Sequence, residues 1–346
     1  MDKKIRGIAG LLFALSLGGW IFGALSSQAD AEAKKPLYSG PITIGAETWP
    51  GYLLLFVARD LGYFKDAGLN VEIKRYLALG ELSKDYVAGK MQGRANLTLD
   101  MVNESLQGLD HKAVLTIDYS NGADAIIAHQ AIATLKDARG KKVAYEPDTL
   151  EEFFIVWALK EAGLGLTDIQ SIAATPEESA RKLAAGESDV AVSHEPYLSK
   201  ILGEGPFHRI YSSADAPGLI TDVLTFRTDF LKSYPETVQA IVETYFRALK
   251  FFQEHPRKAH EILAKEFGDS PESVARQLQG LKLLDEVDNQ TTFTFSGGLQ
   301  SLYGNLRQIG EFVLSHRAKA SLPLDTDQLV EPRFIRQVMK EKRAVQ

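Results

Sequence analysis

The stretch from Pro41 to Glu72 decides the fold, and it reads PITIGAETWPGYLLLFVARDLGYFKDAGLNVE. Its first part, Ile42 to Ala46, is a short apolar run typical of a buried strand. The Pro50-Gly51 turn then leads into an apolar segment from Tyr52 to Leu61 that is long enough for a helix. A second strand is predicted at Leu69 to Ile73. The order strand, helix, strand predicts an α/β fold.

The same alternation continues along the chain. The first run adds a helix at Leu82–Ala88 and strands at Ala95–Leu99 and Ala113–Asp118. The second run contains strands at Ala125–Ala128, Lys142–Glu146, Ile169–Ala173 and Asp189–Ser193, with helices at Leu150–Ala162 and Glu177–Ala185. We expect a last strand at Leu219–Phe226 and helices after it, among them Glu236–Gln253 and Glu272–Leu284.

This repetition predicts two doubly wound α/β lobes with parallel sheets, joined by two hinge crossings, with a ligand cleft between them. Residues 41–122 form the first part of lobe 1, residues 123–221 form lobe 2, and residues 222–346 return to lobe 1 and supply C-terminal helices. Clefts between lobes bury small ligands and close on them by hinge motion. The architecture therefore favours a binding function.

The first 31 residues have the pattern of an export signal. Lys3, Lys4 and Arg6 precede an uncharged apolar stretch, and Ala29-Asp30-Ala31 offers small residues at the two positions that a signal peptidase reads. We expect cleavage after Ala31, a leader at residues 32–40, and a periplasmic location. The alternative is an uncleaved membrane anchor, because the apolar stretch approaches the length of a membrane span.

Composition and charge narrow the function further. The chain has 346 residues, of which 45% are hydrophobic and 24% charged, and a formal net charge of −6. This acidic balance argues against nucleic acid as a partner. The absence of cysteine excludes disulfides, thiolate metal sites and cysteine nucleophiles.

Several blocks resemble a known family when they are taken together and in order. They are Ile44-Gly45 with Glu47 to Tyr52, Ala58 to Phe64, Gly68 to Glu72, Asp118 to Asp124, Leu135 to Ala144, and Gly186 to Val192 before Glu195-Pro196. This set is similar to the periplasmic solute-binding proteins of the nitrate, sulfonate and taurine ABC importers, over roughly residues 41–255. His194 stands where that family often has an aromatic residue.

The resemblance implies a type II periplasmic-binding fold, a ligand held in the cleft, and a membrane permease with its ATPase as partners. The same superfamily includes thiamine-pyrimidine synthases, which carry a cysteine-rich segment that this chain lacks. We therefore expect no enzymatic activity. We also expect no cofactor, no metal site and a monomeric protein.

Candidate binding residues follow from the position of strand ends. In doubly wound sheets, ligands bind beyond the carboxyl ends of the strands, so polar residues just after each strand are candidates. The residues selected in this way, with others from the two crossings, are Glu47, Thr48, Trp49, Tyr52, Asp100, Asn103, Asp118, Asn121, Glu146, Thr149, His194, Glu195 and Asp222.

The candidates are rich in acids, and no Arg or Lys falls at a strand end. Arg94, Lys112 and Lys141 precede strands, and we expect them to face solvent. The local charge favours a ligand with an ammonium group, or a zwitterion, over a bare inorganic anion. Taurine-like or sulfonate ligands stay open, because backbone amides and helix ends bind anions without basic side chains.

Several candidates have a second interpretation. Trp49 stacks on the ligand or covers the first helix, and the turn position favours ligand contact. Asn121-Gly122 is either a hinge turn or a ligand contact. Thr149 is more simply a helix cap than part of an anion site, and Glu195 is more simply a cap before the next helix than a metal ligand beside His194.

Three classes of function stay open at this point. The first is the substrate-binding component of an ABC importer that captures a small polar solute. The second is a sensory receptor tethered to the membrane by an uncleaved N-terminus, and the third is an enzyme of thiamine-pyrimidine biosynthesis. We predict the first, because catalytic motifs such as Gly-x-Ser-x-Gly, His-Glu-x-x-His and the phosphate loop are absent from the sequence.

Overall fold

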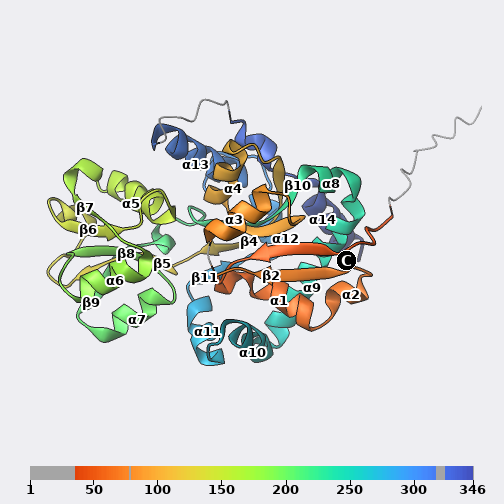
Figure 1. The fold of residues 1–346 in the computed structure, drawn as a ribbon, viewed down its shortest axis with the longest axis horizontal. Helices are drawn as coiled ribbons and strands as arrows, with labels where there is room; N and C mark the ends of the chain where they lie inside the picture. The colour runs from red at the N-terminus through yellow and green to blue at the C-terminus, as the bar shows by residue number, and fades with distance from the viewer. Residues whose placement is uncertain (1–35, 78, 317–323, 346) are drawn as a thin grey trace, which may run out of the picture. The chain divides into compact units, whose positions relative to one another are not determined.

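The computed structural model describes residues 36–77, 79–316 and 324–345, and in this part of the chain the main strands form two sheets (Figure 1). The larger sheet has the order β11-β4-β10-β3-β1-β2 and is built from β1 (Ile42–Ala46), β2 (Val71–Arg75), β3 (Gly93–Leu97), β4 (His111–Ser120), β10 (Thr221–Arg227) and β11 (Leu281–Leu283). The smaller sheet has the order β7-β6-β8-β5-β9 and is built from β5 (Asp124–His129), β6 (Lys142–Tyr145), β7 (Gln170–Ala173), β8 (Val190–His194) and β9 (Phe207–Ser212). The predicted export signal, residues 1–31, lies outside the described residues.

Both sheets are mixed, whereas the sequence pattern predicts parallel sheets. Strand β1 runs parallel to β2 and β3, and β6 runs parallel to β7 and β8. The returning strand β10 is antiparallel to both of its neighbours, β3 and β4, and β5 is antiparallel to β8 and β9. The prediction was wrong for these strands because chain direction at a crossing leaves no mark in the hydrophobic pattern.

Helices pack around both sheets. Those of the first part of the chain are α1 (Leu53–Asp60), α2 (Tyr63–Asp66), α3 (Leu79–Val87) and α4 (Thr98–Leu106). The smaller sheet is flanked by α5 (Leu150–Glu161), α6 (Pro176–Ala184) and α7 (Tyr197–Glu204). The chain then continues through α8 (Thr228–Ser233), α9 (Pro235–Glu254), α10 (Pro256–Phe267), α11 (Pro271–Leu278), α12 (Glu286–Thr292), α13 (Leu302–His316) and α14 (Arg333–Val345).

Short 3-10 turns η1 (Pro50–Tyr52), η2 (Leu135–Ala138), η3 (Leu166–Asp168), η4 (Ser213–Asp215) and η5 (Thr326–Leu329) connect these elements. Residues Lys35–Gln346 cluster as one compact unit. The division of this unit into two lobes stays a prediction.

Helix α1 lies at the centre of the core. Every side chain from Leu53 to Ala58 is fully buried, and α1 contacts β2, α9 and α10. A helix that is apolar on all sides has no face for water, so it is stable only when it is enclosed. This burial fixes the turn between β1 and α1, which carries Glu47, Thr48 and Trp49.

Two predicted elements end earlier than the sequence suggests. The predicted strand Ala95–Leu99 is β3, which ends at Leu97, so Asp100 and Asn103 lie on α4 rather than in a loop. The predicted helix Glu272–Leu284 ends at Leu278, and Leu281–Leu283 pairs with β4 as β11. The helix stops because the carbonyl of Gly280 accepts backbone hydrogen bonds from Asn121 and Ala123.

The segment between β4 and β5 is held by contacts with two other parts of the chain, at Ser213 and Gly280. Ser120 Oγ lies 2.7 Å from Ser213 Oγ, which also accepts a hydrogen bond from the Gly122 amide at 2.7 Å. A Cβ atom on Gly280 would lie 2.8 Å from the Ala123 nitrogen, so only glycine allows this close approach. The crossing from β4 to β5 is therefore a defined structure rather than a loose linker.

Candidate functional site

A cavity of about 780 Å³ collects the ends of strands from both sheets. This volume falls in the usual range for small-molecule sites. Most of the predicted site residues line it: Glu47, Thr48, Trp49, Asp100, Asn103, Glu146, Thr149, His194 and Asp222. The strand-end argument therefore identified a real cavity, although which of these residues contact a ligand stays a prediction.

Four predicted residues do not line the cavity. Tyr52 and Asp118 are buried directly behind it, at 0% exposure. Asn121 is exposed in the crossing, where its backbone amide donates to Gly280. Glu195 is turned into α7, where its carboxylate accepts hydrogen bonds from the amide (3.1 Å) and the hydroxyl (2.7 Å) of Ser199. Glu195 therefore has the capping role that its sequence also suggested.

Several lining residues were not among the predicted set. The acids among them are Asp124, Asp148, Glu151 and Glu177. Glu151 and Glu177 occupy the first turns of α5 and α6, where acids are expected to balance the helix dipole. The signal that could have identified them is their position directly after a strand and its loop, at the same sheet edge as the other candidates.

Trp49 forms one wall of the cavity. Its indole Nε1 donates to Asp118 Oδ2 at 3.4 Å, and its ring lies 6.2 Å from the His194 ring in an edge-to-face arrangement. A Cβ atom on the neighbouring Gly51 would come within 1.9 Å of Asp118 Oδ2, so the contact requires glycine there. Trp49 is half-buried, so part of its ring stays available to the cavity.

Two aspartates, Asp118 on β4 and Asp222 on β10, face each other across adjacent strands. Tyr52 donates its hydroxyl to Asp222 Oδ1 at 2.5 Å. Asp118 Oδ1 and Asp222 Oδ2 are buried with no hydrogen-bond partner in the described part of the chain. Burial raises the pKa of Asp118 to about 8 and, together with the Asp118 charge, holds that of Asp222 well above its ordinary value.

Asp124 and His194 continue this polar cluster on the smaller sheet, where they are partners in adjacent strands. Asp124 is 4% exposed, and burial raises its pKa to about 6. Burial disfavours the charged form of His194, but the carboxylates of Glu151 and Asp124 outweigh this effect and raise its pKa. His194 Nε2 lies 3.7 Å from Glu151 Oε1.

Arg94 is fully buried, which contradicts the expectation that it faces solvent. It lies inside β3, its Nη1 donates to Glu104, and its Nη2 is 3.7 Å from Asp100 Oδ2. Lys141 is exposed and Lys112 is half-buried. The prediction failed for Arg94 because the acids that neutralise it lie on the next helix, α4. The predicted strand Ala95–Leu99 had included the first residues of that helix.

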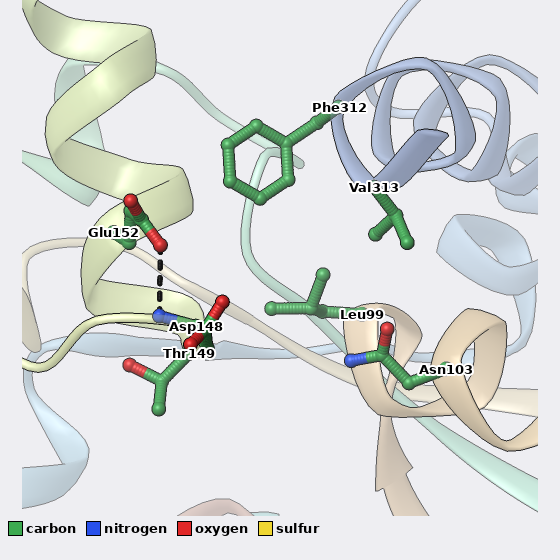
Figure 2. Close-up of a pocket in the computed structure, with 7 residues that line it drawn as sticks. All are labelled: Leu99, Asn103, Asp148, Thr149, Glu152, Phe312 and Val313. Atoms are coloured by element: carbon green, nitrogen blue, oxygen red, sulfur yellow. Dashed lines mark hydrogen bonds between the residues drawn. The ribbon is translucent and has the colours of Figure 1, made fainter. Parts of the chain in front are cut away.

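Thr149 begins α5 as its N-cap, which is the simpler of its two interpretations. Its hydroxyl accepts from the Glu151 amide at 3.3 Å and donates to the Glu146 carbonyl at 2.8 Å. Figure 2 shows this end of α5 facing Leu99 and Asn103 of α4 across a small void of about 10 Å³, enclosed further by two side chains of α13. Asn103 and Thr149 border both this void and the larger cavity.

The electrostatic character of the cavity is acidic. Its carboxylates are Glu47, Asp100, Asp124, Glu146, Asp148, Glu151, Glu177 and Asp222. Among the described residues that line it there is no Lys or Arg, and His194 is the one group that can carry positive charge. Burial raises the pKa of Glu47, and it raises that of Asp100 to about 7 against the opposing effect of Arg94.

Among the described residues, no three His, Asp or Glu side chains are grouped as metal ligands would be. No helix in this part of the chain combines the length and the apolar character that crossing a membrane requires.

A ligand-sized polar cavity at the strand ends of two mixed sheets is typical of a solute-binding protein. The chain belongs to the NMT1/THI5-like family, which matches it over residues 49–259. This match and the structures below confirm the family resemblance found in the sequence.

A relative of known sequence is the "Putative aliphatic sulfonates-binding protein" of Escherichia coli (strain K12), which is 24% identical over 143 residues. That match covers 41% of this chain and 44% of the relative, so it spans less than half of either protein.

Solved structures show the fold along nearly the whole chain. The periplasmic aliphatic sulphonate binding protein SsuA from Escherichia coli superposes with a TM-score of 0.72 at 17% identity, over 88% of this chain and 100% of that one. The periplasmic nitrate-binding protein NrtA from Synechocystis PCC 6803 superposes with a TM-score of 0.67 at 14% identity, over 89% and 90%. The chain has the periplasmic-binding fold, and its relatives support a solute-binding role.

Proposed function

We propose that this protein is the extracytoplasmic substrate-binding component of an ABC importer. It captures a small polar solute in the 780 Å³ cavity and delivers it to a membrane permease and its ATPase. The observation that carries the proposal is that the cavity draws its polar side chains from strand ends of both sheets, in a chain of this family. The first 31 residues act as the export signal, with cleavage after Ala31.

In this proposal, the two lobes close on the bound solute. The two predicted lobes, 41–122 with 222–346 and 123–221, move about the crossings, and a solute between them contacts both. The contact between Trp49 and His194 joins the turn after β1 in one predicted lobe to β8 in the other. A bound solute adds contacts on both sides of the cavity, so it favours the closed form.

A thermal-shift screen of the protein recovered from the periplasm tests the proposal. Taurine, alkanesulfonates, nitrate, urea, polyamines and pyrimidines are added one at a time. A solute that binds only the folded protein raises its melting temperature, by the equivalent of about 2.7 kcal/mol at one hundred times its Kd. The solute should be recovered chemically unchanged. A protein that no solute stabilises, or that converts its solute to another compound, would contradict the proposed function.

A further inference from the structure

We propose that the solute is a small organic cation, whose protonated nitrogen is held by the carboxylates of Asp222, Asp124 and Glu47. This inference rests on the proposed function and specifies its substrate class. It separates this chain from the sulfonate- and nitrate-binding proteins that share its fold.

The first argument is the charge of the walls. The described lining carries many carboxylates and no Lys or Arg, so an anion entering the cavity would be desolvated against like charge. A cation meets carboxyl groups of both sheets, and His194 is the one lining group that can carry positive charge. Charge complementarity of this kind sets which class of ligand a site accepts.

The second argument is that two carboxylates that line the cavity each have one oxygen without a partner. Asp222 is 1% exposed and Asp124 is 4% exposed, and the buried Oδ2 atom of each has no hydrogen-bond partner among the described residues. Buried polar atoms without partners are rare in folded proteins. An ammonium group donates three hydrogen bonds and can supply the donor that these oxygens lack.

Glu47 completes the arrangement. Glu47, Asp124 and Asp222 line the same cavity, and burial, the Asp118 charge and then the charges of Glu47 and Asp124 raise the pKa of Asp222. Glu47 is half-buried and lines the cavity beside Trp49. A positive charge among the three would relieve their mutual repulsion.

The buried Arg94 does not provide an anion site. Its Nη1 donates to Glu104, and its Nη2, which has no hydrogen-bond partner among the described residues, lies 3.7 Å from Asp100 Oδ2, so acids of the protein offset its charge. It is also absent from the cavity lining.

The remaining walls indicate an organic ligand rather than a bare ion. Trp49, Leu97, Leu150 and Ile220 border the same cavity. An indole face attracts cations, and the aliphatic side chains favour an apolar body attached to the charged nitrogen. The volume of about 780 Å³ far exceeds that of a single ion.

The test compares ligands that share a body and differ in charge. Butylammonium and butanesulfonate form one pair, phenethylammonium and 2-phenylethanesulfonate form another, and putrescine, spermidine and a divalent metal salt complete the panel. Each is titrated by thermal shift and calorimetry into the protein recovered from the periplasm and into the variants Asp124→Asn and Asp222→Asn. The control variant is Glu72→Gln, because Glu72 is an exposed acid on β2 outside the cavity.

We expect ammonium compounds to raise the melting temperature and their sulfonate counterparts not to do so. Each Asp→Asn variant should lose at least about tenfold in affinity, and Glu72→Gln should bind as the wild type does. If Asp222→Asn fails to fold, Asp124→Asn alone decides. Stabilisation by sulfonates or by the metal salt alone would overturn the inference and leave the proposed function intact. Stabilisation by no compound in either this panel or the broader screen would contradict both.

Discussion

Replacing Asp124 by Asn should stabilise the empty protein while weakening its affinity for a cation. Asp124 is buried at the start of β5, and its Oδ2 has no hydrogen-bond partner in the described part of the chain. Burial raises its pKa to about 6 from an ordinary value of 3.8, with His194 and Ser120 opposing the rise and Glu151 and Glu195 adding to it. The ionised form is therefore a cost to the folded state that an amide does not have.

The sign and size of this cost follow from proton linkage. A carboxyl whose pKa is higher in the folded state binds its proton more tightly there, so the free energy of unfolding falls as pH rises from about 4 to about 6. The two pKa values correspond to a cost of about 3 kcal/mol at pH 8 and about 0.5 kcal/mol at pH 4. Asn cannot ionise, so the advantage of the variant should be large at pH 8 and small at pH 4.

Thermal unfolding at the two pH values, followed by circular dichroism, measures the effect. At roughly 1.5 °C per kcal/mol for a chain of this length, the variant should melt about 4–5 °C higher than wild type at pH 8, and no more than about 1 °C higher at pH 4. The exposed-acid variant Glu72→Gln should show no such dependence on pH. A variant that melts below wild type by the same amount at both pH values would refute the reasoning, because Asp124 would then be a structural hydrogen-bonding group.

Three further outcomes are expected. Trp49→Ala should weaken binding of the cation by on the order of 1–3 kcal/mol, measured by calorimetry, with a smaller change in melting temperature; the reverse pattern would make Trp49 a core residue. Glu195→Gln should lower the melting temperature slightly, since the cap on Ser199 weakens by about 0.5–2 kcal/mol, and leave affinity unchanged; a marked loss of affinity would return Glu195 to the site. Affinity for an ammonium ligand should rise with pH below about pH 6, where Asp124 is protonated in the empty protein, and below about pH 7 where the proton of Asp100 is displaced, by up to about tenfold per pH unit for each proton, and calorimetry in buffers of different ionisation enthalpy should detect proton release; affinity that falls with pH would exclude this competition.

The fold could be predicted from the sequence because its signals are local. Apolar runs bounded by glycine and proline mark the strands, and the fully apolar Leu53–Ala58 segment marks a buried helix. Most candidate residues were found in the same way, since a strand end is visible in the sequence and the sheet edge brings the ends together. Glu47 and Trp49 follow β1, His194 ends β8, and all three line one cavity.

The other features of the site depend on which segments pair and on where side chains point. Neither leaves a signal in a local stretch of sequence. The apposition of Asp118 and Asp222 is a matter of register between β4 and β10, segments about one hundred residues apart. The burial of Arg94 depends on Glu104, which comes to it from α4. Glu195 follows a strand as the other candidates do, but its carboxylate turns back along the chain to cap α7. The local sequence around Asp118, Arg94 and Glu195 does not distinguish the observed contacts from the alternative ones.

The polarity of the cavity and the fold of the chain are independent properties. The fold rests on buried apolar side chains of α1 and the strands, most of which do not line the cavity, whereas the charge of the cavity rests on a few residues placed after strands. A substitution at such a position changes the charge that a ligand meets without changing the core. The same fold can therefore bind anions in one protein and cations in another. In this chain the unpartnered oxygens of Asp124 and Asp222 lower the stability of the ligand-free protein. A positively charged ligand would supply the missing hydrogen-bond donors, so these oxygens favour a cationic occupant.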